Sequence, residues 1–135
     1  MGTGTDSGII RTHNKLAVYG NVQLIEPKSR HQHRMPDIAM HPGDVYATVN
    51  DDGEPMQITV YGDNLEKLYD IDLDHDHTNG EFPDGHIQRY DKDGNRSLEY
   101  EHLDDTARRY VYLLKNGLAK DKERGINYGY KHRRN

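Results

Sequence analysis

Residues 45–61, with the sequence VYATVNDDGEPMQITVY, carry the clearest indication of the fold. In each half, apolar side chains recur at every second position, which places them on one face of a β-strand. The intervening residues 50–55, NDDGEP, are rich in turn formers. The stretch therefore predicts a β-hairpin with one apolar face. That face consists of Val45, Ala47 and Val49 in the first strand and Met56, Ile58 and Val60 in the second.

The sheet is predicted to continue downstream of this hairpin. A turn at residues 62–64, GDN, leads into residues 65–73, in which Tyr69 and Ile71 share one face and Asp70 and Asp72 the other. Three sequential antiparallel strands form a meander, which is the smallest sheet expected to be stable without help. Residues 85–91 predict a fourth strand.

Upstream, residues 16–19 and 22–25 are apolar and flank Gly20-Asn21, so they predict a short second hairpin. Residues 28–42 follow it and contain two prolines and three histidines without a clean period. They predict an irregular connection between the two hairpins.

A helix is predicted near the C-terminus. Asp104 or Asp105 can cap it, because a short carboxylate accepts hydrogen bonds from the free backbone N–H groups of a first helical turn. Asn116-Gly117 predicts its end. The side chains expected to face the sheet are Ala107, Val111, Leu114 and Leu118. The fold class is therefore α+β: a small antiparallel meander of three to five strands covered by one C-terminal helix, with flexible termini.

Size and composition favour a single domain with a thin core. The chain has 135 residues, of which 33% are hydrophobic, and its mean hydropathy is −1.08. We expect a flexible arm over residues 1–15, one α+β domain over residues 16–119 and a basic tail over residues 120–135.

Several classes of protein are excluded by absences. The chain has no cysteine, which excludes disulfides, thiolate zinc sites and a thiol nucleophile. No run approaches the ~20 apolar residues of a membrane span, and the N-terminus lacks the basic-then-apolar pattern of a secretory signal. A soluble, cytoplasmic protein without a membrane partner is expected.

Charge is unevenly distributed along the chain. Residues 44–105 contain eighteen acidic and four basic residues, whereas residues 106–135 contain nine basic and two acidic. Such a basic segment can bind a phosphate-bearing ligand or an acidic partner, or it can fold back on the acidic middle of its own chain.

The groups best suited to proton transfer or metal binding are concentrated in residues 69–90, YDIDLDHDHTNGEFPDGHIQRY. Two imidazoles facing one cleft can serve as base and acid at neutral pH, as cleavage of RNA by its own 2′-hydroxyl requires, while a cation steadies the phosphate. This chemistry needs no cofactor. Its candidates are His75 and His86 as the acid–base pair and Arg89 on the phosphate.

Two further sets of residues are candidates for binding. The first set is a polar stripe on the predicted helix, formed by Arg108, Tyr112 and Lys115. This stripe can hold a phosphate backbone. The alternative is that it is an ordinary solvent-facing surface. The second set is an alternative to the metal-free chemistry. Histidine and carboxylate side chains can together hold a divalent metal, and the candidates for this site are Asp72, Asp74 and His77.

Three segments resemble a family pattern: residues 58–63 (ITVYGD), 70–75 (DIDLDH) and 83–90 (PDGHIQRY). Together they are similar to the small C-terminal domains of bacterial polymorphic toxins of the Rhs type and to related segments of phage minor-capsid proteins. That pattern runs from a tyrosine-bearing strand through a D-x-D…H element to a Pro-His-x-His segment. Here His86 is kept, but Asp84 and Gln88 stand beside it in place of the paired histidine.

The resemblance implies a nuclease-like toxin domain of phage or mobile-element origin that acts on RNA. Candidate partners are then RNA or another phosphate-bearing ligand, and an immunity protein or phage structural proteins, with association with a virion as an alternative to the cytoplasm. Our leading hypothesis is a metal-independent ribonuclease-type domain. A non-catalytic phage structural or adaptor protein is the second, and a His/Asp metal-binding domain is the third.

Overall fold

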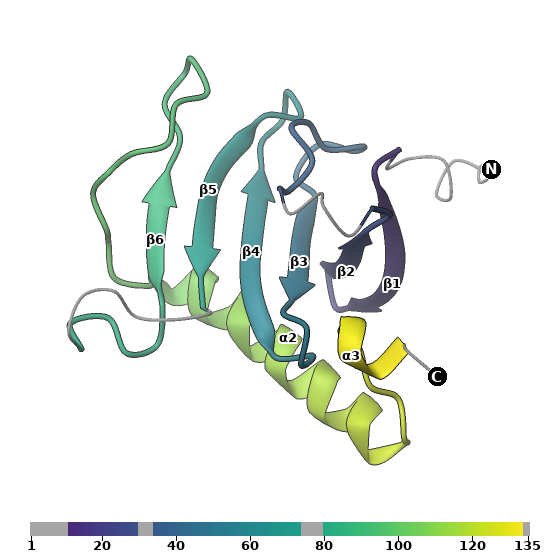
Figure 1. Cartoon of the computed structure of the whole chain (residues 1–135). Coiled ribbons are helices and arrows are strands. Elements are labelled where there is room, and N and C mark those ends of the chain that lie inside the picture. Colours follow the sequence, from purple (N-terminus) through teal and green to yellow (C-terminus); the bar gives the residue numbers. More distant parts are fainter. Residues whose placement is uncertain (1–10, 30–33, 74–79, 134–135) are drawn as a thin grey trace.

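The computed structural model describes residues 11–29, 34–73 and 80–133. These residues form one six-stranded sheet, in which the strands lie in the order in which they occur in the chain (Figure 1). The strands are β1 (His13–Tyr19), β2 (Val22–Pro27), β3 (Val45–Val49), β4 (Pro55–Tyr61), β5 (Lys67–Asp72) and β6 (His86–Arg89). Two helices follow, α2 (Asp105–Glu123) and the short α3 (Tyr130–Arg133). The chain is therefore an α+β protein, as predicted.

The sheet is larger than expected and is mixed. β3 to β6 form the predicted antiparallel meander, but the N-terminal hairpin joins the same sheet because β2 pairs with β3 in parallel. A parallel pair needs a crossover connection, which is described here over residues 28–29 and 34–44. The expectation of three to five antiparallel strands is corrected on both counts.

The two outer strands of the sheet, β1 and β6, differ in what lies along their outer edges. Along β6, the backbone of Ile87 exchanges two hydrogen bonds with Glu101, so residues after β6 cover that edge. Among the described residues, β1 pairs only with β2, and its register shifts between Lys15 and Ala17, as at a β-bulge.

Helix α2 crosses one face of the sheet (Figure 1). Asp104 caps its N-terminus and accepts a hydrogen bond from the backbone N–H of Ala107 at 2.8 Å, as the sequence predicts. Ala107, Val111 and Leu114 are buried against the inward-facing side chains of β2 to β6. The predicted helix face is confirmed.

The predicted end of this helix at Asn116-Gly117 is wrong, because α2 continues to Glu123. A Cβ atom on Gly117 would lie 2.2 Å from the ring of Tyr19 in β1. Glycine here allows the helix and the ring to approach each other closely, so it has a packing role and does not stop the helix.

The opposite face of the sheet has a second, smaller core. The crossover places Met35 and Ala39 against Ile25, Tyr46 and Tyr61, all of them buried. This core covers only the β2–β4 part of that face, so the remaining part, towards β6, is left to polar side chains.

The predicted basic tail is partly helix and partly folded back. Residues 120–123 belong to α2, and the segment after it lies against the β3–β4 turn. Lys131 donates to the carboxylate of Asp52 at 2.8 Å, and its backbone N–H donates to the carbonyl of Asp51 at 3.0 Å. The basic segment thus contacts the acidic middle of its own chain, which was one of the two expected outcomes.

Asp121 joins this C-terminal segment to β1, which leads to a pH prediction. Its buried carboxylate accepts hydrogen bonds from the hydroxyls of Tyr19 (2.6 Å) and Tyr128 (3.2 Å) and pairs with Arg124. The Tyr19 hydrogen bond, more than the ion pair with Arg124, lowers the pKa of Asp121 below its usual 3.8. The unfolded chain therefore binds this proton at a higher pH than the folded chain does.

We expect this contribution to be complete above about pH 5 and to disappear as the pH falls through the folded-state pKa, which lies below 3.8. Urea unfolding followed across this range should give a steeper acid-side fall in the free energy of unfolding for wild type than for Asp121→Asn. Equal slopes for the two proteins would contradict the prediction.

Candidate functional site on the polar face

Strand alternation builds a row of polar side chains on the face opposite α2, which we call the polar face. Tyr69 and Ile71 of β5 point to the α2 side, so Asp70 and Asp72 point to the polar face. The sheet register places the polar residues in two cross-strand rows. One contains Thr48, Gln57, Asp72 and His86, and the other contains Tyr46, Thr59, Asp70 and Gln88.

His86 lies at the end of the first row and is enclosed by aromatic rings. Its side chain is 1% exposed, and its ring stacks on that of Tyr100 with centroids 3.9 Å apart and planes 9° apart. The ring of Phe82 approaches edge-on, with centroids 6.1 Å apart. Neither aromatic residue belongs to a strand or helix, so short irregular segments form this cover.

A chain of hydrogen bonds fixes the tautomer of His86. The amide nitrogen of Gln88 donates to the carbonyl of Ser97 at 3.0 Å, so the amide oxygen of Gln88 is the atom that faces His86, 3.0 Å from Nε2. An amide oxygen only accepts, and therefore Nε2 carries the proton. Nδ1 of the neutral ring is consequently an acceptor with a free lone pair.

No side chain or backbone group in the described part of the chain hydrogen-bonds to Nδ1 of His86, although this atom is buried. Leaving a buried acceptor unsatisfied costs about 1–3 kcal/mol. On the other side of the ring, a carboxylate oxygen of Asp72 lies 3.8 Å from Nε2. In its neutral form, the imidazole thus has a carboxylate on its N–H side and a lone pair on Nδ1, which can accept a proton or bind a metal.

Arg89 does not join His86, because residues three apart in a strand point to opposite faces. Arg89 lies on the α2 side, where its guanidinium is 5.4 Å from the centroid of the Tyr69 ring. Its Nε is 3.0 Å from both carboxylate oxygens of Glu101. The structure thus separates two of the three predicted catalytic residues.

The other predicted residues of the central stretch are not described. His75, Asp74 and His77 lie outside the described ranges, so neither the acid–base pair nor the alternative metal set can be assembled. Asp72 of that set ends β5 on the polar face. Within residues 11–29, 34–73 and 80–133, no three His, Asp or Glu side chains are grouped as a metal site requires.

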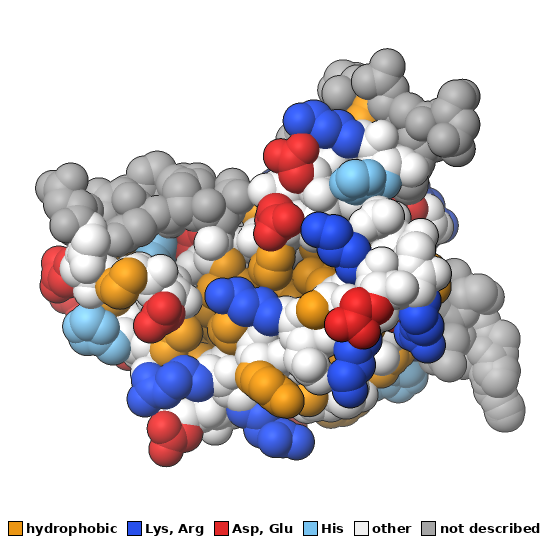
Figure 2. Space-filling view, turned by 90° about the horizontal axis from the view of Figure 1, so that it is seen from below, with side chains coloured by type: hydrophobic (Ala, Val, Ile, Leu, Met, Phe, Trp, Pro, Cys, Tyr) orange, Lys and Arg blue, Asp and Glu red, His pale blue; other side chains and the backbone are white. Residues whose placement is uncertain are grey.

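The predicted stripe on α2 faces solvent. Arg108, Tyr112 and Lys115 are all exposed, Tyr112 with 62% of its surface. Arg108 donates to the carbonyl of Leu103 at 2.6 Å and pairs weakly with Asp105. Seen from below, the side on which α2 lies, Lys and Arg side chains are scattered around hydrophobic surface (Figure 2). The stripe and His86 lie on opposite sides of the sheet.

A buried carboxylate in the second row was not anticipated. Asp70 is 1% exposed and accepts hydrogen bonds from the hydroxyls of Thr59 (2.6 Å) and Tyr90 (2.7 Å). Nε of Arg96 lies 3.1 Å from the same carboxylate and balances its charge. Burial, followed by the bond to Asp70, raises the pKa of Tyr90, so its hydroxyl stays protonated and donates. In the sequence, Thr59 and Asp70 both alternate with the apolar residues of adjacent predicted strands, and this pattern places the two side chains on the same face of the sheet.

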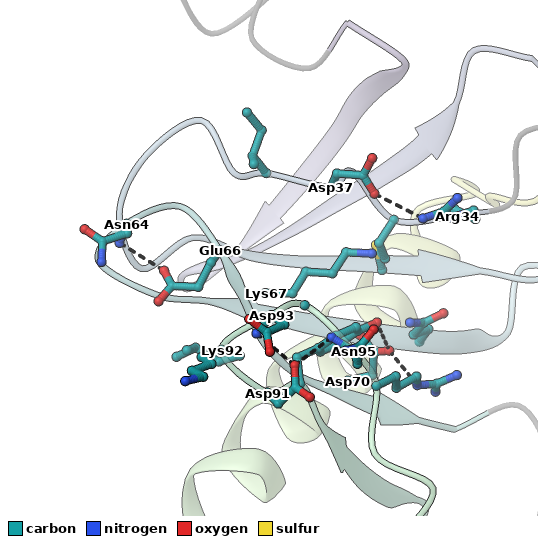
Figure 3. A pocket seen from close by; sticks show the side chains of 17 residues that line it. Arg34, Asp37, Asn64, Glu66, Lys67, Asp70, Asp91, Lys92, Asp93 and Asn95 are labelled. Atoms are coloured by element: carbon teal, nitrogen blue, oxygen red, sulfur yellow. Dashed lines mark hydrogen bonds and ion pairs between the residues drawn. The ribbon is translucent and has the colours of Figure 1, made fainter.

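A hollow of about 1110 Å³ opens above Asp70 on the polar face (Figure 3). Its walls come from the crossover, the β4–β5 turn and the loop after β6. The charged residues of these walls are Arg34, Asp37, Glu66, Lys67, Asp91, Lys92, Asp93 and Arg96. The hollow and His86 therefore occupy neighbouring parts of one face.

No protein-family model, curated protein or solved structure was found to match this chain. Among the described residues, no helix is both long enough and apolar enough to cross a membrane.

Proposed function

We propose that this chain is a small nuclease-type toxin domain that cleaves RNA, with Nδ1 of His86 as the general base. The observation that supports it best is the buried Nδ1, to which no described residue hydrogen-bonds, while Gln88 and Ser97 place the proton of the neutral ring on Nε2. A buried group without a partner is costly in a purely structural role, whereas a base needs an open lone pair. The resemblance of residues 58–90 to polymorphic toxin domains supports the same reading.

In the proposed reaction, Nδ1 of His86 takes the proton of a ribose 2′-hydroxyl, and the resulting oxygen attacks the adjacent phosphorus. The bond from phosphorus to the 5′-oxygen breaks, and that oxygen takes a proton from His75 acting as the acid. The products are a 2′,3′-cyclic phosphate and a 5′-hydroxyl. Because His86 is covered by Phe82, this ring must move aside when RNA binds.

The cation of this reaction is assigned to Arg96 in place of Arg89. Arg96 points to the polar face, where Asp70 holds its Nε. Asp70 and Asp72 are two apart in β5, and their cross-strand partners are Gln88 and His86. The guanidinium is therefore anchored one row from the imidazole on the same face, which suits it to steady a phosphate.

A second candidate is the non-catalytic phage structural or adaptor protein. The burial of His86 favours it, because a ring that is 1% exposed and stacked on Tyr100 packs as a core residue does. The third candidate, a metal-binding domain, draws support from the same Nδ1, since a neutral imidazole nitrogen with a free lone pair is a metal ligand.

RNA degradation measured with and without a chelator separates the three candidates. Cleavage that persists in the chelator and ends in a cyclic phosphate supports the histidine mechanism. Cleavage that the chelator abolishes contradicts it and supports the metal-binding domain. Absence of cleavage under both conditions, with a folded protein confirmed by circular dichroism, contradicts both and supports the structural role.

A further inference from the structure

Lys67 is a half-buried cation that lines the hollow above Asp70. Its ammonium lies 5.4 Å from the centroid of the Tyr90 ring, and no carboxylate of the described residues is within ion-pairing distance of it. Burial lowers the pKa of Lys67, although Asp70 and Asp37 lie near enough to oppose this effect. Burial disfavours the charged form of Lys67, and an anion bound beside the ammonium would favour that form again.

Two arginines reach the same region with capacity to bind a further anion. Arg34 pairs with Asp37 at 3.2 Å, but the side chains are 75% and 79% exposed, and such pairs contribute about 0–1 kcal/mol. A phosphate can therefore displace Asp37. Arg96 uses Nε for Asp70, so its two terminal nitrogens can bind another acceptor. Arg34, Lys67 and Arg96 all line the same hollow.

The carboxylates of the hollow are mostly engaged with the protein itself. Asp70 is neutralised by Arg96 and by two hydroxyl donors. Glu66 accepts from the backbone N–H of Asn64, and Asp91 accepts from two backbone N–H groups of its own turn (Figure 3). Lys67 extends between the Arg34–Asp37 pair and Asp70 (Figure 3). Arginines pair with Asp37 and Asp70, whereas the bonds that Glu66 and Asp91 accept come from uncharged N–H groups. An anion would therefore be held by local contacts with Lys67, Arg34 and Arg96 and not by the net charge of the hollow.

We propose that this hollow binds a phosphate group of single-stranded nucleic acid through Lys67, Arg34 and Arg96. Phosphate contacts of this kind position a strand without reading its sequence. The hollow is lined by Asp70, whose row lies next to that of His86, and by Gln57, which belongs to the same row as His86, so a strand held here would pass the imidazole. The inference rests on the proposed function in taking RNA as the natural strand, but the binding itself does not require cleavage.

The test measures binding of a short fluorescein-labelled single-stranded DNA by anisotropy over a range of salt. DNA lacks the 2′-hydroxyl and is not cleaved by the proposed reaction. Lys67→Met removes the charge and keeps the aliphatic chain on the Tyr90 ring. We expect it to weaken binding roughly fivefold or more at low salt and to reduce the slope of log K against log salt by about one. Lys67→Arg should restore most of the affinity.

The matched control is Lys15→Met, which removes an exposed lysine from β1 at the far edge of the sheet. It should leave both affinity and salt slope unchanged. Equal weakening by Lys67→Met and Lys15→Met overturns the inference, because it indicates a diffuse charge effect. Binding of inorganic phosphate at Lys67 without any binding of DNA also overturns it and assigns the hollow to a free phosphate or a small phosphorylated ligand.

The proposed function and this inference fail in distinguishable ways. If RNA is not cleaved but DNA binding still depends on Lys67, the nuclease proposal fails and the phosphate site stands. If RNA is cleaved but DNA binding is indifferent to Lys67, the phosphate site fails and the nuclease proposal stands.

Discussion

RNA cleavage by the His86→Gln protein is expected to be slower than wild-type cleavage by about 10²- to 10⁴-fold, the usual contribution of a general base. Glutamine is close to histidine in size and polar, but it has no nitrogen that takes up a proton at neutral pH. The rate is measured on a defined RNA oligonucleotide under single-turnover conditions, so that substrate binding and chemistry are separated.

His13→Gln is the matched control for this experiment. His13 is buried like His86, at 2% exposed, but both of its ring nitrogens have partners, Thr12 and the carbonyl of Arg34. The control therefore imposes a comparable loss of packing without touching an open lone pair. Similar cleavage by His86→Gln and wild type, or equal losses in the two variants at matched folded fractions, would exclude His86 as the base.

Removing the carboxylate of Asp70 is expected to lower the free energy of unfolding by about 1–3 kcal/mol, the usual cost of leaving buried hydrogen-bond donors unsatisfied, because the Arg96 side chain is 41% exposed and stays hydrated. Asp70→Ala leaves the Arg96 guanidinium and the hydroxyls of Thr59 and Tyr90 without their acceptor. A small domain is stable by only about 5–15 kcal/mol, so this loss would be large. Urea unfolding followed by circular dichroism measures it.

Asp63→Ala provides the comparison for Asp70→Ala. Asp63 is exposed in the β4–β5 turn, and surface substitutions of this kind usually change stability by less than about 0.5 kcal/mol. If the two alanine variants lose similar stability, the Asp70 network does not hold the polar face together. Asp70→Asn should fall between them, because it keeps one acceptor oxygen and loses the charge.

The sequence predicted those elements that are determined by residues lying close together in the chain. The hairpin of residues 45–61 was found because alternation and turn residues both lie within it, and the Asp104 cap was found for the same reason. The parallel pairing of β2 with β3 depends on how residues 28–44 cross over, which no short pattern encodes. Gly117 was misread because its reason is a ring of β1 almost a hundred residues away.

Some features of the candidate site were likewise predictable from the sequence, and others depend on how distant segments pack together. His86 was predicted from residue type, but its burial by Phe82 and Tyr100 depends on how irregular segments pack. Strand alternation separates Arg89 from His86, because residues three apart in a strand point to opposite faces. Lys67 was not predicted as a site residue, because its surroundings form only when the crossover and the loop after β6 meet over the sheet.

The irregularity of β1 has a consequence for how this protein behaves at high concentration. An outer strand with straight, unpaired backbone groups is a template on which other chains add, the first step towards fibrils. In β1 the register shift between Lys15 and Ala17 bends that template, and exposed Lys15 adds a charge that an incoming strand must bury. The far edge is already occupied by Glu101. The fold thus carries protection against aggregation at both ends of its sheet.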